Sequence, residues 1–343
     1  MPGGKPSRIQ HFSMKSTLNE LSTDERLSFY LNLPAGSETM ELSDDVYQGS
    51  AKMYEENRAL FYYEKYKGSF LEWYCRNLIQ RIPFKKIRSL PNYEQYRNLL
   101  TLSDFLNLFH DAPKEAQEGY YLIYHGEKEL EGHLPYIRKA RKVDDQEGVL
   151  FKLSTIRHFH PCKEAQKEDI EWENKQDDVI WRGATTSAKY RNTFVERYFD
   201  QYDIGFSTTK QFPELADYTR DMVTIEEQLK YKFIVSLEGY DLASNLKWIL
   251  ASNSVPVMPE PTWVSWIMEH KLVPYEHYLP LNEKLDNLEE LLDWAEKNDT
   301  KCQEIAQNGK AYMSQFFDEK KERQIQQELL VKYTQQFDFR PTK

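Results

Sequence analysis

Two apolar runs flank an amphipathic segment in the stretch at residues 231–259. The runs at 231–237 and 255–258 predict two strands, and the segment that begins at Ser244 and Asn245 predicts a helix between them. Ser or Asn at a helix start satisfies free backbone N–H groups, and the positive end of the helix dipole attracts phosphate. The stretch is therefore either an anion site in an α/β sheet or an ordinary, well-capped crossover.

Strands and helices alternate over the whole of residues 178–281. Short apolar runs at 178–181 and 204–206 add two strands to those above. This alternation predicts a doubly wound parallel sheet, whose ligands bind at the carboxyl ends of its strands. The pattern also predicts helices at 192–199, 263–268 and 287–297, and two amphipathic helices around Gly309 at 300–337.

The N-terminal part of the chain has mostly helical periodicity up to residue 109, and short apolar runs rich in strand-forming residues follow from residue 120. Helices are expected at 22–31, 44–80 and 93–109, and strands at 120–124 and 149–153. We therefore expect a helix-rich N-terminal domain at 16–165 and a second domain at 166–343 that ends in helices. Residues 1–15 are expected to be disordered or an expression remnant.

A chain of 343 residues is long enough for two domains. Its net charge of −10 argues against a general nucleic-acid binder. Two basic clusters stand out, RIPFKKIR at 81–88 and RKARK at 138–142. They either contact phosphorylated or membrane-surface acceptors, or they are solvated faces.

Three widely spaced cysteines form neither a disulfide framework nor a CxxC pair, which indicates a reducing compartment. The N-terminus lacks the apolar core of a signal peptide, and no stretch reaches the roughly 18 apolar residues of a membrane span. We therefore expect a cytoplasmic protein. His158, His160 and Cys162 hint at a metal site, but no fourth ligand stands at a useful spacing, and no metal is expected.

Two predicted strand ends carry groups that suit a phosphate. Arg182 and Arg191 follow the first strand of the alternating part, and Ser244 and Asn245 follow the strand at 231–237. Together these groups would cradle a phosphate without a metal. The sequence contains no GxGxxG, GxxxxGK[ST] or GxSxG motif. The plain alternatives are a salt bridge for Arg182 and simple helix capping for Asn245.

Four segments carry a family resemblance: WRGATTSAKYR at 181–191, the stretch at 228–267, LVPYEHYLPL at 272–281 and LDNLEELLDWAEKND at 285–299. In order and spacing they resemble glycosyltransferase family 90 over residues 178–335, and the bacterial lipopolysaccharide branch is most similar. The resemblance implies a GT-B architecture, in which two Rossmann-like domains face each other across a cleft. It implies a C-terminal domain that holds the nucleotide, an N-terminal domain on the acceptor side, and inverting, metal-independent transfer from a UDP-sugar.

The resemblance also implies which residues contact the donor. The arginine-glycine element of the family falls on the first strand end, and its sugar-nucleotide loop falls on the second. Beyond the strand at 255–258, Glu260 and Trp263 would hold the ribose or the uracil. The alternatives are that Glu260 is a surface acid and that Trp263 is a core anchor. The expected donor-binding residues are Arg182, Gly183, Ala184, Arg191, Asp241, Leu242, Ala243, Ser244, Asn245, Lys247, Glu260 and Trp263. Lys247 could instead be simply solvated.

The general base implied by the resemblance is an aspartate just after an N-terminal-domain strand. Here the aligned position is near Gly126, so the candidates are His125 and Glu127 beside it, followed by Asp144. The histidine has an ordinary pKa suited to neutral pH, although it could equally be a turn residue with no role.

The expected reaction moves a hexose from a UDP-sugar to a sugar hydroxyl of the lipopolysaccharide or lipooligosaccharide core or a related surface glycan. A protein O-glycosyltransferase and a catalytically silent sugar-nucleotide- or glycan-binding relative are the alternatives. The expected partners are a UDP-sugar donor and a glycan or glycolipid acceptor, with peripheral contact to the inner membrane surface as an option. Neither a nucleic acid nor a cofactor is expected, since the UDP-sugar is a substrate.

Overall fold

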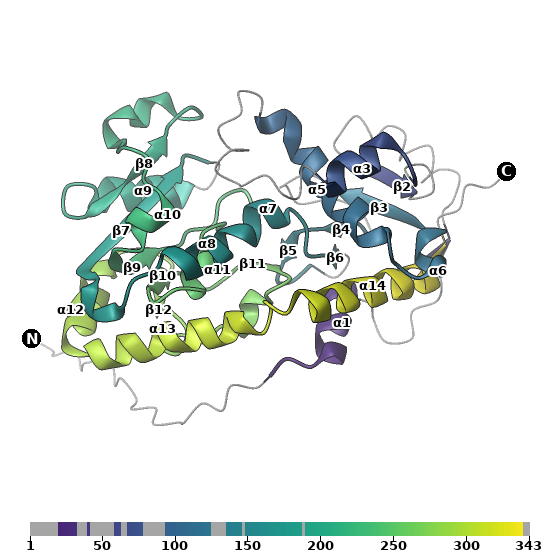
Figure 1. The fold of residues 1–343 in the computed structure, drawn as a ribbon. Coiled ribbons are helices and arrows are strands. Elements are labelled where there is room, and N and C mark those ends of the chain that lie inside the picture. The colour runs from purple at the N-terminus through teal and green to yellow at the C-terminus, as the bar shows by residue number, and fades with distance from the viewer. Residues whose placement is uncertain are drawn as a thin grey trace, which may run out of the picture.

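The computed structural model of the chain contains two lobes, each built around its own sheet (Figure 1). The residues that it describes are 20–32, 40–41, 58–62, 67–77, 93–124, 135–145, 148–186 and 189–338. The segments at 1–15 and 81–88, for which the sequence makes predictions, lie outside this part.

The C-terminal lobe holds a five-stranded sheet in the order β12-β10-β9-β7-β8, and every pair of neighbours is parallel. Its strands are β7 (Gln176–Ala184), β8 (Asp203–Thr208), β9 (Tyr231–Val235), β10 (Val255–Met258) and β12 (Leu279–Pro280). This confirms the predicted parallel sheet. The chain leaves β7 for β8 on one side and later adds β9 on the other, so the strand order reverses between β7 and β9. Ligands of such sheets bind at the carboxyl ends of the strands near this point.

Both faces of this sheet are covered. Val179 and Trp181 of β7 pack in one hydrophobic core with Phe194 of the helix α9, whereas Ile180 packs in another core with Ile249 of the helix α11. Alternate residues of a strand point to opposite faces, so a strand buried on both faces needs the nearly continuous apolar run that the sequence shows. The helices of this lobe are α9 (Lys189–Tyr198), α10 (Ile225–Gln228), α11 (Leu246–Leu250) and α12 (Leu288–Lys297), with short 3-10 turns at Trp172–Asn174, Pro213–Tyr218 and Glu269–Lys271.

The N-terminal lobe holds a four-stranded sheet in the order β2-β3-β4-β6, in which β2 is antiparallel to β3 and the other pairs are parallel. Its strands are β2 (Arg58–Tyr62), β3 (Tyr120–Tyr124), β4 (Ile137–Arg138) and β6 (Val149–Leu150). The predicted helix at 44–80 is thus wrong at residues 58–62. The helices are α1 (Thr23–Leu31), α3 (Phe70–Asn77), α5 (Tyr93–Phe109), α6 (Lys114–Gln117) and α7 (Thr155–His158). The next helix, α8 (His160–Glu168), packs against α10 and α11 of the C-terminal lobe.

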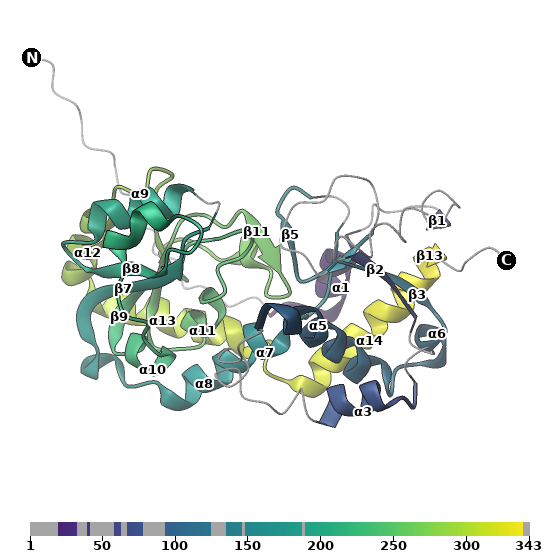
Figure 2. The same ribbon diagram turned by 90° about the horizontal axis from the view of Figure 1, so that it is seen from above.

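A small antiparallel pair joins the lobes: β5 (Ala140–Lys142) pairs with β11 (Trp263–Ser265). The two strands lie side by side between the lobes in Figure 2. The sequence predicts a helix at 263–268, and this prediction is wrong because Trp263–Ser265 are extended along β5. Three residues carry too little local signal to reveal a partner strand more than a hundred positions away.

Two long helices, α13 (Asp299–Ser314) and α14 (Glu319–Gln336), run along the base of both lobes (Figure 1). The break between them lies at 315–318 rather than at Gly309, which sits within α13, where an added Cβ would come within 3.1 Å of Leu250. Helix α14 packs against α1, α5 and α6 of the N-terminal lobe, and β13 (Phe337–Asp338) pairs with β1 (Met40–Glu41). The sequence assigns α14 to the domain at 166–343, whereas its contacts lie with the N-terminal elements.

None of the helices within the described residues combines the length and apolarity needed to cross a bilayer. The basic cluster at 138–142 does not form a solvated face, because Arg138, Lys139 and Arg141 are buried. Arg141 donates to the carbonyl oxygens of Phe29 and Gly148 at 2.7 and 2.9 Å, and burial lowers the pKa of its guanidinium to about 9. Arg141 therefore connects β5 with α1 and the segment before β6 inside the N-terminal lobe.

Candidate functional site

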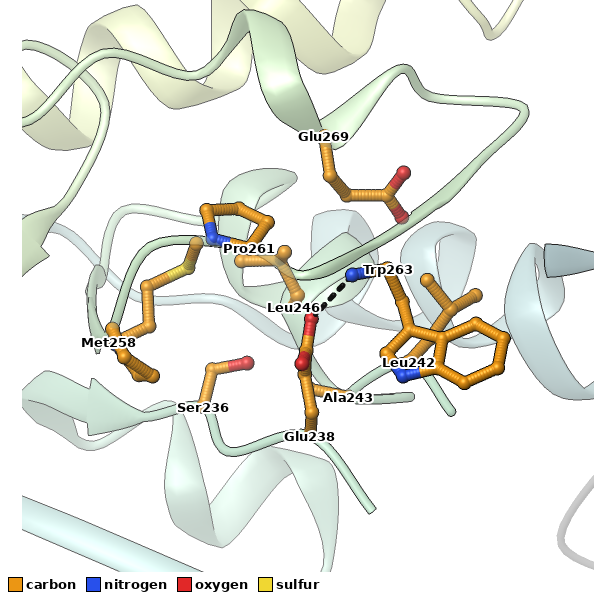
Figure 3. A pocket seen from close by; sticks show the side chains of 10 residues that line it. Ser236, Glu238, Leu242, Ala243, Leu246, Met258, Pro261, Trp263 and Glu269 are labelled. Carbon is orange, nitrogen blue, oxygen red and sulfur yellow. Dashed lines mark hydrogen bonds between the residues drawn. The ribbon is translucent and has the colours of Figure 1, made fainter. Parts of the chain in front are cut away.

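A pocket opens at the carboxyl ends of β9 and β10, between the loop at 236–245 and β11 (Figure 3). About 290 Å³ of space, part of it open to solvent, lies between its atoms. The lining residues are Ser236, Glu238, Leu242, Ala243, Leu246, Met258, Pro259, Pro261, Trp263 and Glu269. Seven of these ten side chains are apolar, and two of the other three are carboxylates. The predicted donor residues Leu242, Ala243 and Trp263 thus lie together in one pocket.

The loop after β9 is folded back onto its own strand. Asn245 directly precedes α11, as predicted, but its side chain does not cap the helix. Its amide group donates to the carbonyl oxygen of Val235 at 2.8 Å and accepts from the Ser236 hydroxyl at 3.1 Å. Helix α11 has only five residues, so its dipole is small. The Asn245 side chain therefore fixes the loop rather than capping the helix, and Ser244 beside it is exposed.

The Glu238 carboxylate holds the opposite wall of the pocket. It accepts hydrogen bonds from the backbone N–H groups of Thr262 and Trp263 at 2.9 and 3.0 Å, and from the Thr262 hydroxyl at 2.5 Å. Figure 3 shows the bond to Trp263. Burial raises the pKa of Glu238 above its usual value. Glu238 is not among the residues predicted from the sequence, although its place just after an apolar strand was a usable signal.

A buried ion pair lies at the other side of the pocket. Lys247 Nζ is 3.0 Å from Glu269 Oε1, and the two side chains are 1% and 2% exposed. Glu269 also accepts from the backbone N–H and the hydroxyl of Ser265 at 2.5 and 2.7 Å. Lys247 is thus neither solvated nor directed at a ligand phosphate, because a partner 22 positions later in the sequence neutralises it. The Glu269 carboxylate lines the pocket, and no local pattern marked it.

Arg191 bridges the ends of β7 and β9, where the strand order reverses. Its guanidinium donates to the carbonyl oxygens of Glu238 at 2.7 Å and Ala184 at 3.1 Å, and also to that of Leu237. The side chain is nine-tenths buried, and burial lowers the pKa of Arg191. Its hydrogen bonds therefore go to the backbone, while its charge remains at the edge where a ligand of this sheet would bind.

The other residues of the first strand end have structural contacts. Arg182 forms an ion pair with Asp203 at 2.5 Å and donates to the Asp203 and Asp221 carbonyl oxygens, which matches the salt-bridge alternative. Gly183 has no room for a side chain, since an added Cβ would lie 2.4 Å from the Trp181 ring. Ala184 contributes its carbonyl oxygen to Arg191.

The remaining predicted donor residues are neighbours of lining residues in the sequence or line the pocket themselves. Asp241 is buried and pairs with Lys139 at 2.6 Å. Glu260, in the loop after β10, is exposed, whereas Trp263 is buried and forms part of the pocket wall.

Of the base candidates, His125 and Glu127 lie outside the described residues. Asp144 is exposed in the turn after β5. The preceding residue, Val143, donates its N–H to the carbonyl oxygen of Thr262 at 2.9 Å, next to pocket-lining Pro261. Asp144 thus directly follows a residue that is bonded to the segment between two lining residues, Pro261 and Trp263.

Within the part of the chain that the structure describes, no group of three or more His, Cys, Asp or Glu side chains is placed to hold a metal ion. His158 and His160 do not share a strand face, since the first lies in α7 and the second begins α8. The Cys162 thiol donates to the His158 carbonyl oxygen, and burial raises its pKa to about 12.

The lining of the pocket combines an apolar surface with two hydrogen-bond-accepting carboxylates, which would suit a neutral, flat and hydroxyl-bearing group. The carboxylates of Glu238 and Glu269 would repel a phosphate but can accept hydrogen bonds from hydroxyl or ring N–H groups. The indole of Trp263 and the prolines beside it offer an apolar surface for a planar ring. An anionic group of the same ligand would instead lie outside the pocket, toward the positive charge of Arg191.

Comparisons with known proteins place these observations in a family. The model of "Glycosyl transferase family 90" matches residues 156–343. The chain is 34% identical over 188 residues to O-glucosyltransferase LpsA of Dichelobacter nodosus, covering 53% of this chain and 57% of that protein. It is 25% identical over 194 residues to O-glucosyltransferase rumi of Drosophila melanogaster, covering 50% and 44%. It is also 24% identical over 150 residues to Protein O-glucosyltransferase 1 of Mus musculus, covering 41% and 38%. The matched part thus spans 57% or less of the length of each of these three relatives.

Proposed function

Since this chain belongs to glycosyltransferase family 90, we propose that it transfers a hexose from a UDP-sugar to a hydroxyl group of a glycan. The observation that carries the proposal is the pocket at the carboxyl ends of β9 and β10, which lies wholly within the matched residues 156–343. Its apolar walls and two carboxylates suit the uridine part of a nucleotide sugar.

The donor would lie across the reversal point of the sheet. Uracil and ribose would occupy the pocket, with Trp263 against the ring and Glu238 or Glu269 accepting from ribose hydroxyls. The diphosphate would lie outside, near the loop at 240–244 and the charge of Arg191. Because the guanidinium is already bonded to three carbonyl oxygens, it would stabilise the diphosphate by electrostatic attraction rather than by a direct hydrogen bond. Arg182 supports the strand end through Asp203 rather than contacting the donor.

The reaction would be an in-line displacement with inversion. Asp144 would take the proton of the acceptor hydroxyl, whose oxygen forms a bond to the anomeric carbon as the bond from that carbon to the diphosphate breaks. UDP then leaves with the bonding electron pair, stabilised by Arg191 and by backbone N–H groups of the loop, without a metal ion. The bond from the preceding residue, Val143, to the Thr262 carbonyl oxygen supports this assignment, because it ties the turn that carries Asp144 to the segment beside the pocket.

A GT-B arrangement accounts for the two lobes. The C-terminal lobe would hold the donor and the N-terminal lobe the acceptor, with β5 and β11 joining them beside the pocket. The contacts of α14 with α1, α5 and α6 support this arrangement, because the chain returns to the N-terminal lobe at its end.

The acceptor that we favour is a sugar of the lipopolysaccharide or lipooligosaccharide core, or a related surface glycan. The similarity to a bacterial O-glucosyltransferase, at 34% identity, supports this choice and favours glucose as the hexose. The similarity to Protein O-glucosyltransferase 1 supports a protein acceptor as the second candidate. A cytoplasmic location with peripheral contact to the inner membrane would suit a glycolipid acceptor.

The proposal is tested by measuring UDP release from a panel of UDP-sugars in the presence of EDTA. We expect turnover of UDP-glucose in preference to other UDP-hexoses, increased by a lipooligosaccharide core acceptor. Binding of UDP without turnover of any UDP-sugar, with either glycan or peptide acceptors, would instead identify a catalytically silent sugar-nucleotide-binding relative.

A further inference from the structure

A buried ion pair joins the two lobes beside the pocket. Lys139 Nζ lies 2.6 Å from Asp241 Oδ2, and the two side chains are only 10% and 8% exposed. Lys139 directly follows β4 of the N-terminal sheet, whereas Asp241 belongs to the loop that forms the pocket wall in the C-terminal lobe. Two charges removed from water are tolerated only when they are closely paired, so this contact fixes the distance between the strand and the loop.

The residues that follow the two charges form the apolar side of the same joint. Ala140 follows Lys139, Leu242 follows Asp241, and both belong to a small buried cluster completed by Trp263. Leu242 and Trp263 are also walls of the pocket. A shift of the ion pair would therefore move the two walls against which a ligand packs.

The other bonds of the loop at 239–245 stay within the C-terminal lobe. Gly239 N–H donates to the Asp241 carbonyl oxygen at 2.9 Å, the Tyr240 hydroxyl donates to the side chain of Gln211, and the bonds of Asn245 fix the far end. The carboxylate of Asp241 is thus the group through which the N-terminal lobe holds the middle of the loop.

We propose that Lys139 is a positioning residue for the donor: through Asp241 it keeps the loop at 239–245 closed against β5 and β11. This inference rests on the proposed function, because it assigns the effect to donor binding. Lys139 need not touch the donor, and its role is to set the position of Leu242 relative to Trp263.

The first test is hydrogen exchange of the loop, which does not depend on activity. In Lys139→Met, the amides at 239–245 should exchange about tenfold faster or more than in the wild type. The matched control is Lys175→Met, since Lys175 pairs with Asp169 at the same 2.6 Å, is buried even more completely, and lines no part of the pocket. It should leave loop exchange unchanged even if it lowers stability. Equal exchange in Lys139→Met and wild type would overturn the proposal. If Lys139→Met does not fold, Asp241→Asn gives the same comparison.

The second test is the split between KM and kcat for UDP-glucose. Lys139→Met should raise KM about tenfold and change kcat by less than about threefold, whereas Lys139→Arg should recover part of the loss. An unchanged KM in Lys139→Met would overturn the positioning role even if loop exchange is faster. A wild-type protein that turns over no UDP-sugar would refute the proposed function separately, while the exchange comparison would still decide whether Lys139 holds the loop.

Discussion

The Nε–H group of Arg191 donates a hydrogen bond to the carbonyl oxygen of Glu238 over 2.7 Å. This bond connects the helix after β7 with the loop after β9, at the point where the order of the sheet reverses. The same glutamate uses its carboxylate to hold Thr262 and Trp263. One residue therefore links the buried cation to the far wall of the pocket.

Arg191→Ala should consequently weaken both the fold and the donor site. The Arg191 hydrogen bonds to three carbonyl oxygens are lost, although the Glu238 oxygen keeps another donor, the Tyr190 hydroxyl. We expect the free energy of unfolding to fall by about 2 to 3 kcal/mol. The KM for UDP-glucose should rise as the loop loosens and the positive charge is lost. Arg191→Lys should recover only part of the lost stability and only part of the rise in KM, because an ammonium group cannot reproduce the planar set of hydrogen bonds. Urea unfolding and steady-state kinetics measure the two effects, and wild-type values in both would remove Arg191 from the site.

Asp144→Asn tests the base. If Asp144 accepts the acceptor proton, kcat should fall by about 10² to 10⁴ while the affinity for UDP stays constant. Asp200→Asn is a suitable control, since Asp200 is likewise an exposed aspartate in a turn. A kcat within about twofold of the wild type in Asp144→Asn would exclude this residue as the base.

Lys247→Met tests the buried pair at the pocket. It leaves the carboxylate of Glu269 buried without its cation, which should cost about 3 to 5 kcal/mol of stability. Adding Glu269→Gln should recover part of this loss, because the neutral amide oxygen can still accept from Ser265. The check is urea unfolding of both variants, and a double variant that is less stable than Lys247→Met would contradict the assigned pairing.

The buried Lys152 should make the free energy of unfolding depend on pH. It contacts Glu322 and the rings of Phe159 and Trp266, and burial lowers its pKa from 10.5 to about 8. Between these values the unfolded chain keeps a proton that the folded chain has released, so this group makes stability rise with pH. Relative to that of Lys152→Met, the free energy of unfolding of the wild type should rise by on the order of 3 kcal/mol from pH 8 to pH 10.5. A stability difference between the two proteins that stays flat over this range would contradict the shift.

The strands of the C-terminal sheet could be predicted because each is a local apolar run. Strand β9 and the Val255–Met258 run were visible in this way, and so was the position of the loop between them. By contrast, β2 and β11 each depend on a partner far along the chain, and Arg58–Tyr62 pairs with residues some sixty positions later. Periodicity within a short window contains no information about such a partner.

The residues of the candidate site could likewise be predicted only in part from the sequence. The loop residues Leu242 and Ala243 were expected from the family resemblance, and Trp263 from its place just past the strand at 255–258; all three line the pocket. The sequence could not predict where the charged side chains point. Arg182 and Lys247 are neutralised by Asp203 and Glu269, which only the folded chain brings near.

The structure of the chain crystallised with UDP in the presence of EDTA tests the central claim most directly. We predict that the uracil and ribose lie between the loop at 236–245 and β11, that a ribose hydroxyl lies within hydrogen-bonding distance of Glu238 or Glu269, and that the diphosphate lies outside the pocket on the side of Arg191. UDP bound at another place on the chain, or phosphates inside the pocket against the two carboxylates, would contradict the account.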